Sequence, residues 1–241
     1  MNLNDLIGTA ILIAYYALVC GLVPALLKWL TKTPAELVRK IQHVGYSLSV
    51  VLLLNLFTTW YAAIAGALAL VLVAYPALWL MENLSWYRVA FVDRAVVGGE
   101  LRKSLVQVQV TFIILIFVFW GVLGERWTPI IVVAAMAWGF GDAAAALVGK
   151  AWGRRYVISR FVDRAKTYEG TAAMIVVAGT ALFWSLRFAA GGSWSASLLI
   201  ATIVAPVCGA VELLSRRGTD TVTVPLTTAF TLLPLMYWFD F

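Results

Sequence analysis

The stretch that decides the fold is Ile41-Gln-His-Val-Gly-Tyr-Ser-Leu-Ser-Val-Val-Leu-Leu-Leu-Asn-Leu-Phe-Thr-Thr-Trp60, which continues to Met81 without an acidic residue, lysine or arginine. A helix needs about 20 apolar residues to cross a bilayer, so this stretch has twice the length that one crossing requires. Asn55-Leu-Phe-Thr-Thr59 is a polar break at which the chain can turn. The stretch therefore predicts two membrane helices joined as a hairpin.

Further apolar intervals divide the rest of the chain in the same way. They are Leu6–Leu27, Ser104–Gly124, Thr128–Gly149, Gly170–Leu186, Ser195–Val211 and Thr221–Phe239. The first interval is predicted to remain as a helix and not to be a cleaved signal peptide, because it is long and no lysine or arginine precedes Lys28. We therefore expect an all-α, polytopic membrane helix bundle with about eight spans, forming a single integral membrane domain over residues 1–241.

The composition agrees with this fold class and excludes several functions. The 241 residues are 63% hydrophobic and 12% charged, whereas soluble domains have about a quarter charged residues. The net charge of +6 indicates membrane lipids or an anionic substrate as partners and no nucleic acid, because the chain has no room for a solvated basic face. Cys20 and Cys208 lie in apolar runs, which excludes a disulfide framework and a cysteine metal cluster.

The basic residues predict the orientation in the membrane. Sixteen of the 18 lysines and arginines fall in four loops, at about residues 28–40, 82–103, 150–169 and 214–220, which leaves only Arg126 and Arg187 for the other side. By the positive-inside rule the four loops are cytoplasmic, and both termini lie on the opposite side. In the second loop, aromatic and charged residues mixed between Trp86 and Arg94 predict an amphipathic helix at the interface.

Asp142 is the acidic residue that most needs an explanation. It lies within a predicted span, and a carboxylate in hydrocarbon costs roughly 2.5 to 3.5 kcal/mol on insertion scales. Small residues recur around it at intervals of four, in a stripe formed by Gly141, Ala145, Gly149 and Gly153. Such a stripe most often serves helix packing, but a buried carboxylate beside it favours a ligand site.

Two further polar segments lie on the same predicted face. Lys166 and Glu169 stand where the next span begins, with Thr167 as a helix cap and free backbone N–H groups that favour a phosphate; simple capping also explains Thr167 and Glu169. Glu212 and Asp220 flank the last predicted loop, and Glu212 could instead pair with Arg216 on its own helix. Carboxylates that hold Mg²⁺, surrounded by lysine and arginine, are what a nucleoside triphosphate site requires.

These motifs resemble those of the phytol kinase and dolichol kinase family. The resemblance rests on Trp138-Gly-Phe-Gly-Asp-Ala-Ala-Ala-Ala-Leu-Val-Gly-Lys-Ala-Trp-Gly153, Lys166-Thr-Tyr-Glu-Gly-Thr-Ala-Ala-Met174, Glu212-Leu-Leu-Ser-Arg-Arg-Gly-Thr-Asp-Thr-Val-Thr-Val-Pro225 and Arg39-Lys-Ile-Gln-His-Val-Gly45. The chain departs from the family in having Thr167 where serine is usual and Thr221 where asparagine is frequent.

The resemblance implies a polytopic enzyme that phosphorylates a prenol such as phytol, farnesol or dolichol, usually from CTP and with Mg²⁺. The resemblance also implies that the matching residues bind the nucleotide. They are Asp142, Ala145, Gly149, Gly153, Lys166, Glu169 and Gly170, to which we add the neighbouring Gly141 and Thr167.

Our hypothesis for the chemistry assigns a role to each group. Asp142, with Glu212 or Asp220, holds Mg²⁺ on the triphosphate, and Lys166 neutralises the β and γ phosphates. His43, or a carboxylate such as Glu169, accepts the alcohol proton.

Alternative functions stay open at this point. The nearest are a phosphatidate cytidylyltransferase-like enzyme that uses CTP and a CTP-dependent diacylglycerol kinase. A small secondary transporter ranks lower, because the charges gather on one face and the sequence shows no inverted repeat. The choice between CTP and ATP and a homo-oligomeric state are open as well.

Overall fold

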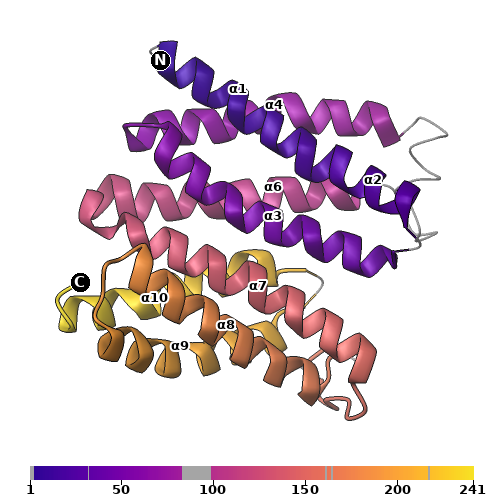
Figure 1. Ribbon diagram of the computed structural model, residues 1–241, viewed down its shortest axis with the longest axis vertical. Helices are drawn as coiled ribbons and strands as arrows, with labels where there is room; N and C mark the ends of the chain where they lie inside the picture. The colour runs from indigo at the N-terminus through magenta and orange to yellow at the C-terminus, as the bar shows by residue number, and fades with distance from the viewer. Residues whose placement is uncertain (1–2, 32, 83–98, 161, 164, 217) are drawn as a thin grey trace. The chain divides into compact units, whose positions relative to one another are not determined.

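The computed structural model describes residues 3–31, 33–82, 99–160, 162–163, 165–216 and 218–241, without the side chains of Lys28, Ala35 and Glu100. Within these ranges the chain forms helices and no strand (Figure 1). The predicted all-α fold class is confirmed. The α-helices are α1 (Leu3–Ala17), α2 (Val23–Leu30), α3 (Ala35–Leu56), α4 (Trp60–Glu82), α6 (Glu100–Leu115), α7 (Thr128–Trp152), α8 (Tyr168–Phe188), α9 (Trp194–Leu214) and α10 (Asp220–Trp238).

The helices have the length and apolar composition of membrane spans. Seven helical segments in the described ranges are long and apolar enough to cross a bilayer: Leu3–Leu27, Glu36–Leu56, Trp60–Met81, Leu101–Val122, Glu125–Trp152, Tyr168–Phe188 and Trp194–Leu214. Two of them continue through π-helical turns, Leu18–Leu22 after α1 and Ile116–Val122 after α6. The predicted hairpin is confirmed, because α3 ends at Leu56 and α4 begins at Trp60.

The eighth predicted span, Thr221–Phe239, corresponds to α10, which is not among the seven but runs the length of its neighbours. It begins at Asp220 beside the end of α9, and Phe241 beyond its other end lies against Gly192 in the loop between α8 and α9. The carbonyl oxygen of Phe241 also accepts a hydrogen bond from Arg126 Nε, just before α7, at 3.0 Å.

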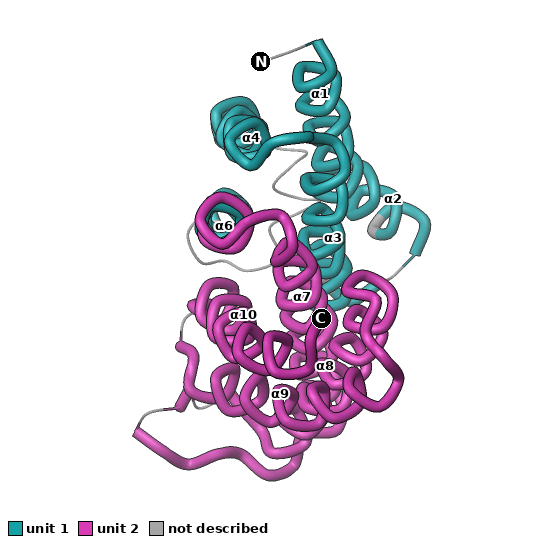
Figure 2. Tube along the Cα trace, turned by 90° about the vertical axis from the view of Figure 1, so that its left-hand side faces the viewer, with its two compact units in different colours: residues 1–117 teal, residues 118–241 magenta. Residues whose placement is uncertain are grey.

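The chain forms two compact units, residues 1–117 and residues 118–241 (Figure 2). In unit 1, α1 packs against α3 and α4, and α4 packs against α6. In unit 2, α7 packs against α8, α8 against α9, α9 against α10, and α10 returns to α7, so four antiparallel helices close a bundle. The predicted interfacial helix between Trp86 and Arg94 lies outside the described residues.

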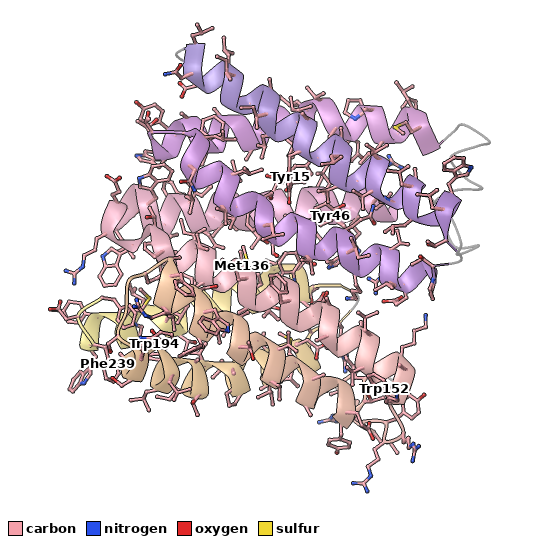
Figure 3. The ribbon with its side chains drawn as sticks, viewed as in Figure 1. Tyr15, Tyr46, Met136, Trp152, Trp194 and Phe239 are labelled. Carbon is pink, nitrogen blue, oxygen red and sulfur yellow. The ribbon has the colours of Figure 1, made fainter. Side chains whose placement is uncertain are left out.

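Unit 2 has a polar end and an aromatic end. One end of the bundle consists of the loop 153–167, the turn 215–219 and the four helix ends that they join, and we call it the polar end. At the aromatic end, the guanidinium carbon of Arg187 lies 5.1 Å from the ring centre of Trp194, and Trp184 stacks on Phe188 (Figure 3). Such rings are typical of a membrane–water interface.

Candidate active site

Asp142 lies inside α7, the most buried of the seven candidate spans. The residue is only 3% exposed, with Trp138 buried one turn before it and Ala145 buried one turn after it. Since an isolated ionised carboxylate is very costly to bury, this position requires favourable partners for the charge or a proton on the carboxyl group. Asp142 is therefore the strongest single indication of chemistry in unit 2.

The stripe of small residues forms a packing seam between α7 and α8. A Cβ added to Gly149 would lie 3.0 Å from Thr167 Oγ1, and one added to Gly170 would lie 2.8 Å from the carbonyl oxygen of Ala145. On the next turns, a Cβ on Gly141 would meet the sulfur of Met174 at 2.5 Å. The glycines therefore let the backbones of α7 and α8 approach closely, which is the packing role that the sequence also allowed. They also fix the position along α7 at which α8 begins.

A further glycine, Gly153, continues this seam beyond the end of α7. A Cβ there would lie 2.7 Å from Thr167 Cγ2. Gly149, Gly153 and Gly170, which were predicted to contact a nucleotide, thus let the loop 153–167 and the start of α8 pack closely on α7.

The predicted helix cap at Thr167 is confirmed. Its Oγ1 accepts a hydrogen bond from the backbone N–H of Gly170 at 3.1 Å, and the residue is 3% exposed. The backbone N–H of Tyr168 donates to the carbonyl of Arg155 at 3.0 Å, and Glu169 Oε2 accepts from the N–H of Arg155 at 3.3 Å. The N–H groups of Tyr168 and Gly170 are thus engaged within the protein, and Glu169 helps to fold the loop back onto the helix.

Lys166 and Glu212 form an ion pair across the polar end. Lys166 Nζ donates to the backbone carbonyl of Glu212 at 2.8 Å and also pairs with Oε1 of its carboxylate. The side chain of Lys166 is 21% exposed and that of Glu212 is 5% exposed. The pair joins the residue just before the cap of α8 to the last turn of α9, and the ammonium keeps a third N–H for another acceptor.

The turn between α9 and α10 is held by hydroxyl groups. Ser215 Oγ and Thr223 Oγ1 are 2.6 Å apart, and Thr219 Oγ1 donates to the carbonyl of Arg216 at 2.9 Å. Gly218 has φ +79°, a left-handed conformation that glycine adopts without strain. The turn places Asp220 in the first turn of α10, where the helix dipole favours a negative charge.

A group of exposed cations lies in the same loops and helix ends. We call it the basic rim, and it consists of Lys150, Arg154, Arg155, Arg160 and Arg216. All of them belong to the polar end or to the last turn of α7. Guanidinium groups bind phosphate oxygens in a bidentate manner, so the basic rim suits a polyphosphate or lipid phosphates.

The described residues contain no group of three or more histidine, cysteine, aspartate or glutamate side chains that could hold a metal ion. Mg²⁺ in kinase sites is usually held by one or two carboxylates together with substrate phosphates and water. Asp142 in α7 and Asp220 in the first turn of α10 stand on two helices that pack together. The carboxylate of Glu212 pairs with Lys166.

His43, the remaining predicted residue, belongs to unit 1. It is 6% exposed on α3, and its ring centre lies 6.0 Å from that of Tyr46.

Sequence reasoning missed a buried set of polar side chains in unit 1. Gln109 Nε2 donates to Tyr16 Oη, which lies 2.8 Å from Ser49 Oγ. These residues come from α6, α1 and α3, and Tyr15 and Tyr46, labelled in Figure 3, lie between α1 and α3 as well. A glutamine within an apolar span was the available signal, because polar side chains there are rare and usually paired.

The sequence comparison connects this arrangement with a known enzyme. The chain is 33% identical over 212 residues to the phytol kinase of Synechocystis, and the match covers 85% of this chain and 81% of the relative. This chain belongs to the phytol and dolichol kinase family. No family model matches the sequence, and no solved structure matches it.

Membership of the phytol and dolichol kinase family agrees with the apolar helices described above. The protein is an integral membrane protein and a member of a family of lipid kinases. The match extends over most of the chain, so it includes large parts of both units.

Proposed function

We propose that this protein transfers the γ-phosphate of CTP to the hydroxyl group of a prenol such as phytol, farnesol or dolichol, with Mg²⁺. The observation that carries the proposal is the Lys166–Glu212 pair at the polar end, which also holds the basic rim, in a member of the phytol and dolichol kinase family. A partly buried lysine with a third N–H besides its two contacts with Glu212, together with exposed arginines in the neighbouring loops, suits a triphosphate better than it suits a neutral ligand.

The phosphates are bound by side chains in this proposal. The backbone N–H groups of Tyr168 and Gly170 have partners within the protein. The negatively charged triphosphate is therefore bound by Lys166 and the basic rim. The glycines between α7 and α8 let the two helices pack closely, and this packing fixes the position of Lys166 along α7.

Phosphoryl transfer then needs few catalytic groups. The alcohol oxygen forms a bond to the γ-phosphorus, the bond from that phosphorus to the bridging oxygen breaks, and CDP leaves. His43 or a carboxylate accepts the alcohol proton, and Lys166 stabilises the charge on the β and γ phosphates.

Asp142 and Asp220 are the residues that would hold Mg²⁺. A bound ion would supply positive charge to offset that of the phosphates. Asp142 supplies a carboxylate that is shielded from water, and Asp220 supplies one at the start of a helix.

The test is lipid labelling by the purified protein in detergent with Mg²⁺. CTP labelled at the γ or at the α phosphate, and ATP labelled at the γ phosphate, are each offered with phytol, farnesol, dolichol, diacylglycerol and phosphatidate. We expect label from the γ position of CTP in a prenol.

Other outcomes would replace the proposal. Label from the α position in phosphatidate would make the protein a cytidylyltransferase, and γ label in diacylglycerol would make it a diacylglycerol kinase. Transfer from ATP alone would change the donor. No transfer from either nucleotide would favour the transporter hypothesis.

A further inference from the structure

Unit 1 contains a directed chain of hydrogen bonds between three helices. The hydroxyl of Ser49 donates to the carbonyl of Tyr46 at 2.7 Å, so its oxygen is left to accept from the hydroxyl of Tyr16. The oxygen of Tyr16 in turn accepts from Gln109 Nε2. Each hydroxyl has one proton, so the order of donors along this chain is determined.

This order also determines how the amide of Gln109 is turned. If the amide were reversed, its oxygen would face Tyr16 Oη, whose only proton is already given to Ser49. The NH₂ group must therefore point to Tyr16, and Oε1 points away from it as an acceptor.

Oε1 of Gln109 has no hydrogen-bond partner among the residues that the structure describes. Gln109 is 0% exposed, so bulk water does not reach this oxygen. A buried acceptor without a donor is costly, and buried polar networks are usually fully satisfied. An open acceptor at the end of an otherwise ordered chain indicates a place for a donor from outside the protein.

The buried residues beside Gln109 on α6 limit the kind of donor. Leu105 and Phe112, on the same face of α6 as Gln109, are fully buried or nearly so, as is Val108 beside it. The hydrogen-bonded members of the chain, Tyr16 and Ser49, are neutral. One O–H on an apolar molecule satisfies such a site, whereas a charged or multiply hydroxylated ligand would leave further polar groups without partners.

The position in the sequence suits a lipid that enters from the membrane. Gln109 is six residues beyond Lys103, which corresponds to about 9 Å along a helix and therefore to hydrocarbon below the headgroups. His43 lies on α3 one turn before Tyr46, the residue at which the hydrogen-bond chain ends.

We propose that Gln109 Oε1 accepts a hydrogen bond from the hydroxyl of the lipid alcohol, so that unit 1 carries the alcohol-binding site. This inference rests on the proposed function for the identity of the alcohol. Tyr16 and Ser49 are positioning residues, because they orient the amide and do not touch the alcohol.

The experiment compares an alcohol with the same molecule lacking its O–H donor. The melting temperature of the detergent-solubilised wild-type protein is measured against the concentration of phytol and of phytyl methyl ether, without nucleotide. The same titrations are made with Gln109→Met, which keeps the size of the side chain, and with Ser47→Ala. Ser47 is a matched control, since it is buried in α3 and donates to Val44 within its own helix.

We expect the wild-type protein and Ser47→Ala to bind the alcohol about tenfold more tightly than the ether, as loss of one hydrogen bond predicts. Gln109→Met should bind both alike, and its KM for the alcohol should rise about tenfold while its KM for CTP is unchanged.

Two results would overturn the inference. One is equal binding of alcohol and ether by the wild-type protein, which needs no variant to fold. The other is a folded Gln109→Met that still prefers the alcohol tenfold. If the wild-type protein prefers the alcohol but transfers no phosphate, the proposed kinase activity fails and the alcohol site stands; if it transfers phosphate without this preference, only the site fails.

Discussion

At Lys166 and Glu212, opposite charges meet where little solvent reaches them. Removing one partner of such a pair leaves a buried charge without compensation, whereas replacing both by apolar groups is often tolerated. A comparison of the single and the double replacement can therefore distinguish a structural role of Lys166 from a role in catalysis.

Lys166→Met should lower kcat/KM by about a hundredfold or more, because a cation at the phosphates is lost. Glu212→Gln should mainly raise the KM for CTP, because Lys166 stays but is held less firmly. In the double variant Lys166→Met with Glu212→Leu, the melting temperature should recover and the activity should not. Recovered activity in the double variant would show that Lys166 is only a structural partner of Glu212.

Asp142→Asn keeps the shape of the side chain and removes its charge. We expect a loss of about a hundredfold in kcat with a preserved fold, because a carboxylate at the phosphates is lost. Asp163→Asn, in the loop 153–167, is the control and should retain activity. Steady-state kinetics over a range of Mg²⁺ concentrations measures the effect, and full activity of Asp142→Asn in a folded protein would exclude the assignment.

At the scale of the helix, α8 and α9 offer a matched comparison of two caps. Thr167 Oγ1 accepts from Gly170 N at the polar end, and Ser193 Oγ accepts from Ala196 N at the aromatic end. Thr167→Val and Ser193→Ala should each destabilise by about 1 kcal/mol. Only Thr167→Val should raise the KM for CTP, while Thr167→Ser should behave as wild type. Equal KM values for Thr167→Val and Ser193→Ala would show that the cap of α8 does not affect nucleotide binding.

The α7–α8 seam predicts an order among alanine substitutions. Gly170→Ala should destabilise most, by about 1–3 kcal/mol, because its Cβ would meet the backbone oxygen of Ala145. Gly149→Ala and Gly141→Ala should each cost less, because the atoms nearest to the added Cβ, Thr167 Oγ1 and the sulfur of Met174, belong to side chains. Gly21→Ala is the control, since the added Cβ would have no atom of the described residues within 4 Å apart from its chain neighbours and the backbone of its own helix.

Thermal unfolding in detergent ranks these variants. A Gly141→Ala protein as unstable as Gly170→Ala would contradict a seam in which backbone contacts decide the spacing.

At the scale of the whole molecule, the orientation in the membrane can be tested with cysteines. Cys20 and Cys208 are buried, so the background of labelling is low. Ser159→Cys in the loop 153–167 should react with an impermeant maleimide only from the cytoplasmic side, and Ser195→Cys at the aromatic end only from the other side. Labelling of both from one side would contradict the crossing of α8 that the bundle requires.

Local properties of the sequence determined much of this protein. Hydropathy and charge act residue by residue on the cost of leaving water, so the spans, the turn after Leu56 and the membrane location were predictable. The cap at Thr167 was predictable too, because a cap depends on the next three residues alone.

Only the tertiary structure decided which polar groups meet. Lys166 and Glu212 are 46 positions apart, and Gln109 and Tyr16 are 93 apart. Their pairing depends on which helices pack together and on how far each is rotated, and the packing of glycines such as Gly149 and Gly170 sets this geometry. The sequence thus determined an integral membrane protein built of helices, and helix packing decided that Glu212 pairs with Lys166 and that Gln109 Oε1 has no hydrogen-bond partner among the described residues.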